Sequence, residues 1–181
     1  MMYKISKQNT IPSKWDGGLT YEYFIYPQES NYSDRNFDFR ISSATIEKIP
    51  SHFTHFSGYF RYLVMLENSL NIFRNKTNES FAKHEVFKFD SNENIVSNSL
   101  GDDFNLMISN RFSDHDLILF EVNAIINSDW IILFSLSENV VSIDNMEHKL
   151  IANDCILIEN YEKVNVEIST LTKIILATIN R

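Results

Sequence analysis

The sequence is poor in glycine. It holds four glycines in 181 residues, at positions 17, 18, 58 and 101, whereas an average composition of about 7% would give roughly 13. This scarcity excludes a glycine-rich loop that cradles phosphate, because such loops need several glycines close together. Asn, Asp and Ser must make most of the turns instead. We therefore expect the four glycines to lie at positive φ, or where the backbone passes close to another group.

Cysteine is nearly absent as well, since Cys155 is the only one. A single cysteine excludes an intrachain disulfide, which is typical of proteins in a reducing compartment. Cys155 lies in the apolar run 151–158, where no neighbouring side chain would favour a thiolate. We predict a buried, unreactive thiol rather than a nucleophile.

Long apolar runs are missing too. The longest, residues 130–134, is far shorter than the roughly 20 residues of a membrane-spanning helix, and the N-terminal residues lack the apolar core of a secretory signal. The formal net charge of −8 disfavours binding to nucleic acid and to anionic membrane surfaces. We therefore expect a cytoplasmic protein that binds neither nucleic acid nor membranes.

What the sequence does contain is a series of short β-prone runs. No segment keeps a helical period over three turns, whereas β-branched and aromatic runs recur between turns rich in Asn, Asp and Ser. This pattern is typical of an all-β sandwich or barrel. We also expect a hairpin that joins residues 61–66 to residues 70–74, a turn over residues 75–80, and one strand over residues 150–158.

The strands fall into two sets, which predict two domains in one compact body. Residues 1–111 carry the recognisable motifs and are expected to form a first barrel. Residues 112–181 contain a second set of strands of comparable length, expected to pack tightly on the first set because no linker separates them.

Strict alternation marks residues 37–46 as a strand with two different faces. One face is mainly apolar, and the other carries Arg40, Ser42 and Ala44. The second face is small and polar apart from its arginine. It fits the lining of a ligand-binding interior and a solvent-facing side equally well.

Three groups of motifs follow one another in the first part of the chain. The first is Trp15-Asp-Gly-Gly-Leu-Thr-Tyr-Glu22 with Tyr26-Pro27. The second is Phe37-Asp-Phe-Arg-Ile-Ser-Ser-Ala-Thr45 with Phe53-Thr-His-Phe-Ser-Gly-Tyr-Phe-Arg61. The third is Phe87-Lys-Phe89 with Leu100-Gly-Asp-Asp-Phe-Asn-Leu-Met107. In their order and spacing, these motifs resemble the HutD/Ves family over residues 15–111.

The chain departs from the family pattern at three places. Phe39 stands where the family usually has Trp, Phe60 stands where an acidic residue usually precedes Arg61, and Ser91 lies in a stretch where Gly-Asp is usual. These departures indicate a divergent member of the family and leave its ligand open.

The resemblance implies a cytoplasmic bacterial protein of cupin-like fold, which is an RmlC-type jelly-roll β-barrel. With two sets of strands, we expect a bicupin of two fused barrels. The resemblance also implies a role around histidine utilisation and the binding of a small acidic metabolite such as a formylated glutamate. Cupin barrels often bind metal through a His-x-His pair, but none of the five histidines has that spacing. We therefore expect no metal and no other cofactor.

Arg40 and Arg61 are the foremost candidates for binding an acidic ligand. Each is flanked by apolar residues, where an unpaired guanidinium is costly. A ligand carboxylate would satisfy either guanidinium with two parallel hydrogen bonds. The alternative is a structural salt bridge to Glu22, Asp38, Asp102 or Asp103.

Further polar and aromatic residues complete the candidate pocket. Asp103 and Asn105 either contact the ligand or lock the turn at Gly101, and Trp15 either lines the pocket mouth or plugs a barrel end. The full set is Trp15, Gly17, Gly18, Thr20, Glu22, Arg40, Ser42, Arg61, His84, Asp103 and Asn105.

We expect a binding protein rather than an enzyme, because the sequence places no nucleophile beside a base and no two carboxylates together. No residue is assigned a catalytic role. One alternative is a metal-independent isomerase or lyase that acts on a small acid, with Glu22 or His84 as the base. The other is a stress-linked interaction protein without a ligand. A homodimer is expected because exposed aromatic strand edges need cover.

Overall fold

The computed structural model describes all residues from Met1 to Arg181. It is built almost entirely of strands, with one short 3-10 helix, η1 (Lys7–Asn9), so the predicted all-β class is confirmed. None of its helical turns is long and apolar enough to cross a membrane. The chain forms two compact units. Thr10–Arg111 form the inserted unit, and Met1–Asn9 together with Phe112–Arg181 form the terminal unit.

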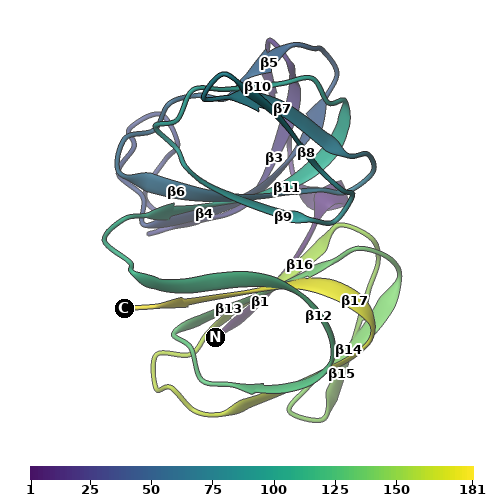
Figure 1. Cartoon of the computed structure of the whole chain (residues 1–181). Helices are drawn as coiled ribbons and strands as arrows, with labels where there is room; N and C mark the ends of the chain where they lie inside the picture. Colours follow the sequence, from purple (N-terminus) through teal and green to yellow (C-terminus); the bar gives the residue numbers. More distant parts are fainter. The chain divides into compact units, whose positions relative to one another are not determined.

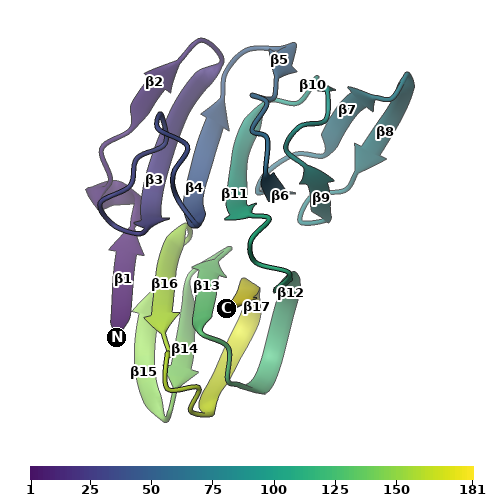
Figure 2. The same ribbon diagram turned by 90° about the vertical axis from the view of Figure 1, so that its left-hand side faces the viewer.

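The inserted unit contains two antiparallel sheets (Figures 1 and 2). The larger has the order β2-β3-β4-β11-β6-β9 and the smaller has the order β5-β10-β7-β8. The strands of the larger sheet are β2 (Ser13–Trp15), β3 (Gly18–Tyr26), β4 (Phe39–Ile46), β6 (Tyr59–Met65), β9 (Val86–Asp90) and β11 (Gly101–Ser109). Those of the smaller are β5 (Ser51–His52), β7 (Leu70–Arg74), β8 (Thr77–Phe81) and β10 (Ile95–Ser97).

Apolar side chains from both sheets form one core cluster. It comprises the buried residues Leu63, Met65, Leu70, Ile72, Phe87, Phe89 and Ile95. These positions alternate along β6, β7 and β9, as expected when every second side chain of a strand points to the same face. The alternating sequence pattern therefore builds the shared interior of the two sheets.

The predicted hairpin between residues 61–66 and 70–74 is wrong. β6 pairs with β11 on one side and β9 on the other, so neither of its edges is open to β7. β7 pairs instead with β8 and β10 in the smaller sheet. The predicted turn over 75–80 is also too long. Only Asn75 and Lys76 turn the chain, both at positive φ, and Thr77 already belongs to β8.

The Asp16-Gly17 turn joins β2 to β3, with Trp15 opposite Gly18. Gly18 has φ +152°, and a Cβ atom there would lie 1.9 Å from the backbone oxygen of Thr45. Only glycine permits this approach of β3 to the end of β4. The expectation of close backbone contact or positive φ is confirmed here and at Gly58 and Gly101, which have φ +85° and +108°.

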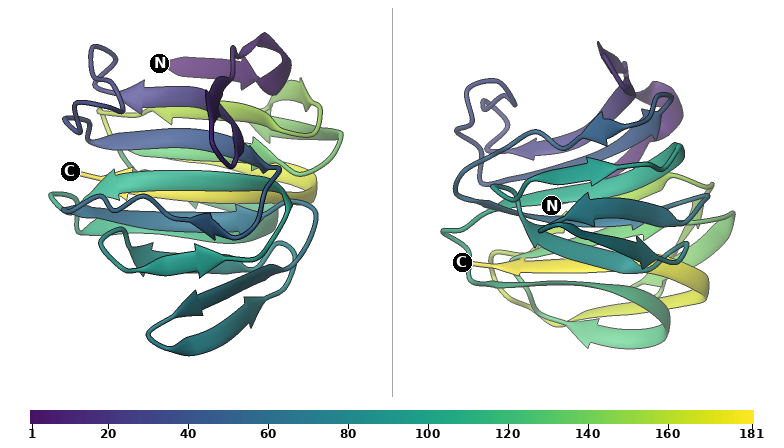
Figure 3. Two further views of the ribbon diagram at one scale, coloured as in Figure 1. Left: turned by 90° about the horizontal axis from the view of Figure 1, so that it is seen from above. Right: turned by 45° about the horizontal axis from the view of Figure 1, so that its top comes forward.

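The terminal unit contains one seven-stranded sheet. Six strands have the order β1-β16-β13-β17-β14-β15, and β12 pairs with β17. Figure 3 shows the long yellow strand β17 that runs from the C-terminus across this unit. The strands are β1 (Met2–Ser6), β12 (Asp114–Ile126), β13 (Trp130–Ser135), β14 (Asn139–Ile143), β15 (Met146–Leu150), β16 (Asp154–Glu159) and β17 (Val166–Asn180).

The first strand lies in the terminal unit, which differs from the expected division at residue 111. β1 pairs with β16 from Met2 opposite Ile158 to Ser6 opposite Asp154, and Met1–Asn9 therefore belong with the C-terminal residues. Sequence position alone suggested otherwise, because this pairing joins segments about 150 residues apart. The inserted unit is thus a continuous segment between β1 and β12.

Two local features of the terminal unit differ from a regular sheet. The register of β12 against β17 shifts between Phe120 and Val122, and Val122 has φ +94°, which is unusual for a β-branched residue. The predicted strand over 150–158 is divided, because Asn153 at φ +67° lies in the turn between β15 and β16. Cys155 on β16 is fully buried, as predicted.

Candidate functional site

The inserted unit contains a cavity of about 350 Å³ between its two sheets. One wall comes from β3, β4, β6 and β11, and the other includes β5 and the residues that follow it. Its lining residues are Ser13, Trp15, Thr20, Tyr32, Arg40, Ser42, Ala44, Ile46, Ser51, His52, Phe53, Thr54, Arg61, Leu63, Asp103, Asn105 and Met107. Both candidate arginines therefore line one cavity.

The register of the larger sheet arranges the cavity wall in rows. Arg40 and Arg61 lie on either side of Met107 in the first row. Asn105, with Ser42 and Leu63 beside it, forms the second, and Asp103 lies opposite Ala44 in the third. The face of β4 that carries Arg40, Ser42 and Ala44 thus lines the cavity instead of facing solvent.

Arg40 is held by partners within the protein. Its Nε donates a hydrogen bond to Glu22 Oε2 at 2.5 Å, and its Nη1 donates to Ser42 Oγ at 3.3 Å. Its guanidinium carbon also lies 4.4 Å from the centre of the Tyr32 ring. The salt bridge to Glu22 that the sequence left as an alternative therefore exists, and it satisfies this arginine.

Arg61 is in a different situation, although its side chain is only 6% exposed. Its Nη2 donates to the backbone oxygen of Thr54 at 2.9 Å, but its Nε has no hydrogen-bond partner. Ion pairs in this unit engage Arg40, Lys48, Arg74 and Arg111, but not Arg61. The pKa of Arg61 is lowered, chiefly because burial disfavours the charged guanidinium, and the positive charge of Arg40 adds to this effect. Interaction with Tyr32 and the negative charge of Asp103 partly oppose it.

Phe60, which replaces the family's acidic residue, does not change the polarity of the cavity. Successive side chains of a strand point to opposite faces, and Phe60 does not line the cavity that Arg61 lines. Its ring lies 5.8 Å from the ammonium of Lys88. The departure therefore removes no acidic group from the immediate cavity wall.

Asp103 bonds to the neighbouring strand β4 and also lines the cavity. Its Oδ1 accepts a hydrogen bond from the backbone nitrogen of Ala44 at 3.0 Å, and its carboxylate lines the cavity at 3% exposure. Asn105 and Ser51 also line the cavity. Asn105 Oδ1 and Ser51 Oγ are buried without hydrogen-bond partners. The cavity wall thus contains buried polar atoms without hydrogen-bond partners, which are rare in folded proteins.

Trp15 and Thr20 line the cavity near the β2–β3 turn, whereas Gly17 and Gly18 do not. A Cβ atom on Gly17 would lie 2.1 Å from the Trp15 ring, so the glycine lets the indole fold back over the turn. Trp15 is 37% exposed. This matches a place at the cavity mouth better than a plug buried in a barrel end.

Glu22 and His84 do not line the cavity. Glu22 is engaged by Arg40, and His84 lies in the turn between β8 and β9 with φ +65°. Sequence reasoning missed Tyr32, Ser51, His52 and Thr54, which come from loops and a two-residue strand without periodicity. Of these four, only Thr54 lies within a motif, the 53–61 stretch of the second group.

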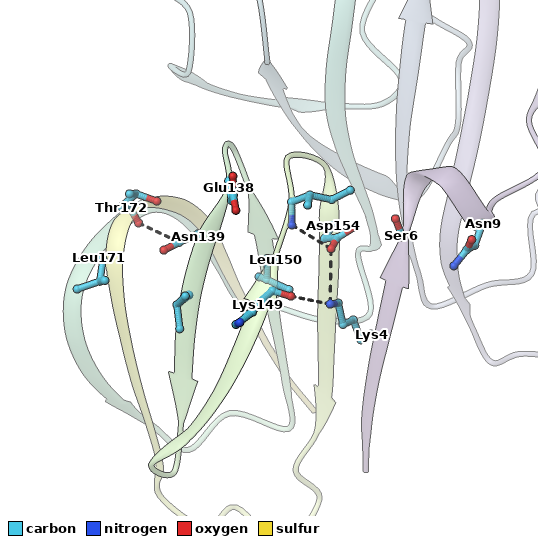
Figure 4. Close-up of a pocket in the computed structure, with 12 residues that line it drawn as sticks. Lys4, Ser6, Asn9, Glu138, Asn139, Lys149, Leu150, Asp154, Leu171 and Thr172 are labelled. Carbon is cyan, nitrogen blue, oxygen red and sulfur yellow. Dashed lines mark hydrogen bonds and ion pairs between the residues drawn. The ribbon is translucent and has the colours of Figure 1, made fainter.

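A second cavity, of about 780 Å³, lies in the terminal unit (Figure 4). Lys4 on β1 and Asp154 on β16 both line it, and their charged ends lie next to each other. The Lys4 ammonium donates to the backbone oxygen of Lys149 at 2.6 Å and lies 3.8 Å from Asp154 Oδ2. Because this buried carboxylate already faces a cation, the cavity offers a weaker case for an ionic ligand than the one beside Arg61.

Neither unit presents a cluster of three or more His, Cys, Asp or Glu side chains arranged to hold a metal ion. His52 lines the inserted-unit cavity and is exposed. The chemistry available in that cavity is therefore that of two guanidinium groups, one carboxylate, one imidazole, amide and hydroxyl groups, and aromatic rings.

Comparisons with known proteins agree with this architecture. The HutD family model matches residues 7–176. A structure of HutD from Pseudomonas fluorescens SBW25 has a TM-score of 0.84 at 17% identity, covering 99% of this chain and 98% of that chain. A conserved protein of unknown function from Pseudomonas aeruginosa PAO1 has the same TM-score, 0.84, at 17% identity, with 100% of both chains covered.

More distant similarities extend to other cupin-type proteins. The bacterial pirin YhhW from Escherichia coli, in complex with nickel(II), has a TM-score of 0.68 at 11% identity and covers 99% of both chains. No curated protein matches the sequence. At such low identities the solved structures establish the fold, which is cupin-type and all-β, and leave the ligand to the residues of the site.

Proposed function

This chain belongs to the HutD family, and from that premise we propose that it binds a small acidic metabolite in the cavity of the inserted unit. The carboxylate of the metabolite binds Arg61, and Arg40 lies beside it in the same row. We propose a binding protein and not an enzyme, since Glu22 is paired with Arg40 and His84 lies outside the cavity lining.

The observation that supports this proposal is the buried Arg61 guanidinium without an ion pair. Burying a charge without a partner costs several kcal/mol. A guanidinium presents donors in a fixed fork that matches a carboxylate. Arg61 is only 6% exposed and its Nε is unpartnered. An anion that enters the cavity would offset a cost that the protein carries when the cavity is empty.

The family supports a finer proposal. We propose a ligand of the formylated glutamate type and a regulatory role in histidine utilisation, exercised in the cytoplasm. The two units would then be the two barrels of a bicupin, with the ligand in the inserted one, and the protein would pair as a homodimer.

Thermal unfolding against a panel of carboxylates tests the proposal. A ligand at a hundred times its dissociation constant stabilises the folded state by about 2.7 kcal/mol, which raises the midpoint by roughly 5–10 °C for a chain of this size. The panel contains formylglutamate, glutamate, glutarate and pentanoate, together with their uncharged amides.

Arg61→Ala should abolish the shift. Arg74→Ala is the matched control, because Arg74 is paired with Glu79 and Glu93 and does not line the cavity. A panel without any carboxylate-specific shift would overturn the proposal and favour a protein that acts through protein partners.

A further inference from the structure

The cavity wall changes its charge along β11. Met107, Asn105 and Asp103 lie at every second position of this strand and all line the cavity. The row of Met107 carries both arginines, whereas the row of Asp103 carries a carboxylate beside the small residue Ala44. Successive rows are about 7 Å apart, because a strand rises 3.2–3.4 Å per residue. By backbone position, the two arginines therefore lie at one end of this wall and Asp103 lies at the other.

Between these ends the wall offers acceptors. Asn105, whose Oδ1 has no hydrogen-bond partner, lies in the middle row. Arg61 and Asp103 line the same cavity, and the negative charge of Asp103 raises the pKa of Arg61. A small molecule can therefore contact both ends.

We infer that the ligand is bipolar: its acidic group binds at the Arg61 end, and its other end carries an N–H or O–H hydrogen-bond donor that faces Asp103. This inference rests on the proposed function, since Arg61 must hold the acidic group. Where the ligand has two acidic groups, as a formylated glutamate does, both must lie toward the arginines. An acid at the Asp103 end would face a carboxylate that is 3% exposed, where like charges repel strongly because solvent screening is weak. An amide, ammonium or hydroxyl group meets an acceptor there instead.

Four five-carbon probes test this inference by isothermal titration: pentanoate, 5-hydroxypentanoate, 5-aminopentanoate and glutarate. They share one carboxylate and differ only at the far end, which is a methyl, hydroxyl, ammonium or second carboxylate group. We expect 5-aminopentanoate and 5-hydroxypentanoate to bind at least tenfold more tightly than glutarate and severalfold more tightly than pentanoate.

Asp103→Asn is the informative variant. In the native chain, Asp103 Oδ1 accepts a hydrogen bond from the Ala44 nitrogen at 3.0 Å. The asparagine amide oxygen can still accept this bond, but the negative charge is removed. The tenfold preference for 5-aminopentanoate over glutarate should fall to about twofold or reverse. Ser80→Ala, on β8 outside the cavity, is the control.

The outcomes separate this inference from the proposed function. If glutarate binds the native protein as tightly as 5-aminopentanoate, and Arg61→Ala abolishes both, the carboxylate site stands and the bipolar ligand is wrong. If neither the four probes nor formylglutamate bind, the proposed function fails and the inference fails with it. The affinity of the native protein for 5-aminopentanoate relative to glutarate tests the bipolar ligand even if Asp103→Asn does not fold.

Discussion

Arg40 and Arg61 lie opposite the same residue, Met107, on the two neighbours of β11, yet only Arg40 is joined to a carboxylate. The two arginines are almost equally buried, at 7% and 6% exposure. They therefore form an internal comparison of a paired and an unpaired guanidinium in one wall. Arg40 is thus paired with Glu22, whereas Arg61 has no carboxylate within ion-pair distance.

This difference predicts opposite effects of removing the two charges. Arg61→Met should leave the free energy of unfolding within about 1 kcal/mol of the native value, or raise it, because an apolar side chain of similar size removes an unpaired buried charge. Arg40→Met should lower it by about 1–2 kcal/mol, since it breaks a hydrogen-bonded ion pair. Urea unfolding measures both. A loss of more than about 2 kcal/mol in Arg61→Met would show that Arg61 is chiefly structural.

Gly18 and Gly58, two of the four glycines of the inserted unit, should differ sharply in their tolerance of alanine. Gly18→Ala places Cβ 1.9 Å from the Thr45 oxygen, so we expect a loss above about 3 kcal/mol. Gly58→Ala has its nearest atom 3.8 Å away and should cost only about 1–2 kcal/mol, from its positive φ. Chemical denaturation compares the two, and equal losses would contradict the close approach of β3 to β4.

The bulge in β12 predicts a substitution that does not destabilise. Val122 is 61% exposed and has φ +94°, where a β-branched side chain is strained by about 1–3 kcal/mol. Val122→Gly relieves this strain and should raise the thermal midpoint or leave it unchanged. Ile125→Gly is the matched control. Ile125 is 66% exposed and lies in register with Glu167, so glycine there should cost about 1 kcal/mol. If Val122→Gly and Ile125→Gly lowered the thermal midpoint equally, Val122 would not be strained.

The thiol of Cys155 should not react with disulfide reagents in the folded protein. Cys155 is fully buried, and this burial, together with the nearby Asp154, raises its pKa above the ordinary value. Thiolate is the reactive form, so a disulfide reagent at pH 8 should label the native protein only at the rate of its opening. In denaturant, one thiol per chain should react at once. Rapid labelling without denaturant would show that β16 opens readily.

Local patterns predicted the parts of the site that lie on regular strands. Alternation along residues 37–46 grouped Arg40 with Ser42 and Ala44, and the spacing of Asp103 and Asn105 grouped those two, because a strand has a period of two. All five line the cavity. Whether this face of the strand lines an interior or faces solvent depends on the second sheet that covers it, and no local pattern predicts that sheet.

The features of the fold and of the site that the sequence did not predict depend on which strands are neighbours in the sheets. The expected hairpin between residues 61–66 and 70–74 is the simplest connection, but β9 and β11 occupy both edges of β6. In the same way, Glu22 was one of four proposed partners for the arginines, and only the pairing of β3 with β4 brings it to Arg40. Tyr32 comes from a polar loop, where no period indicates which side chain turns inward.

The pairing of β1 with β16 has a consequence for synthesis on the ribosome. Residues 2–6 have no partner until Asp154–Glu159 have been made, which at about 5–20 residues per second is a delay of roughly 10–30 s. The inserted unit is continuous in sequence and can fold during that delay. The inserted unit should therefore form first in the nascent chain, and β1 should remain accessible to chaperones and proteases until Asp154–Glu159 emerge.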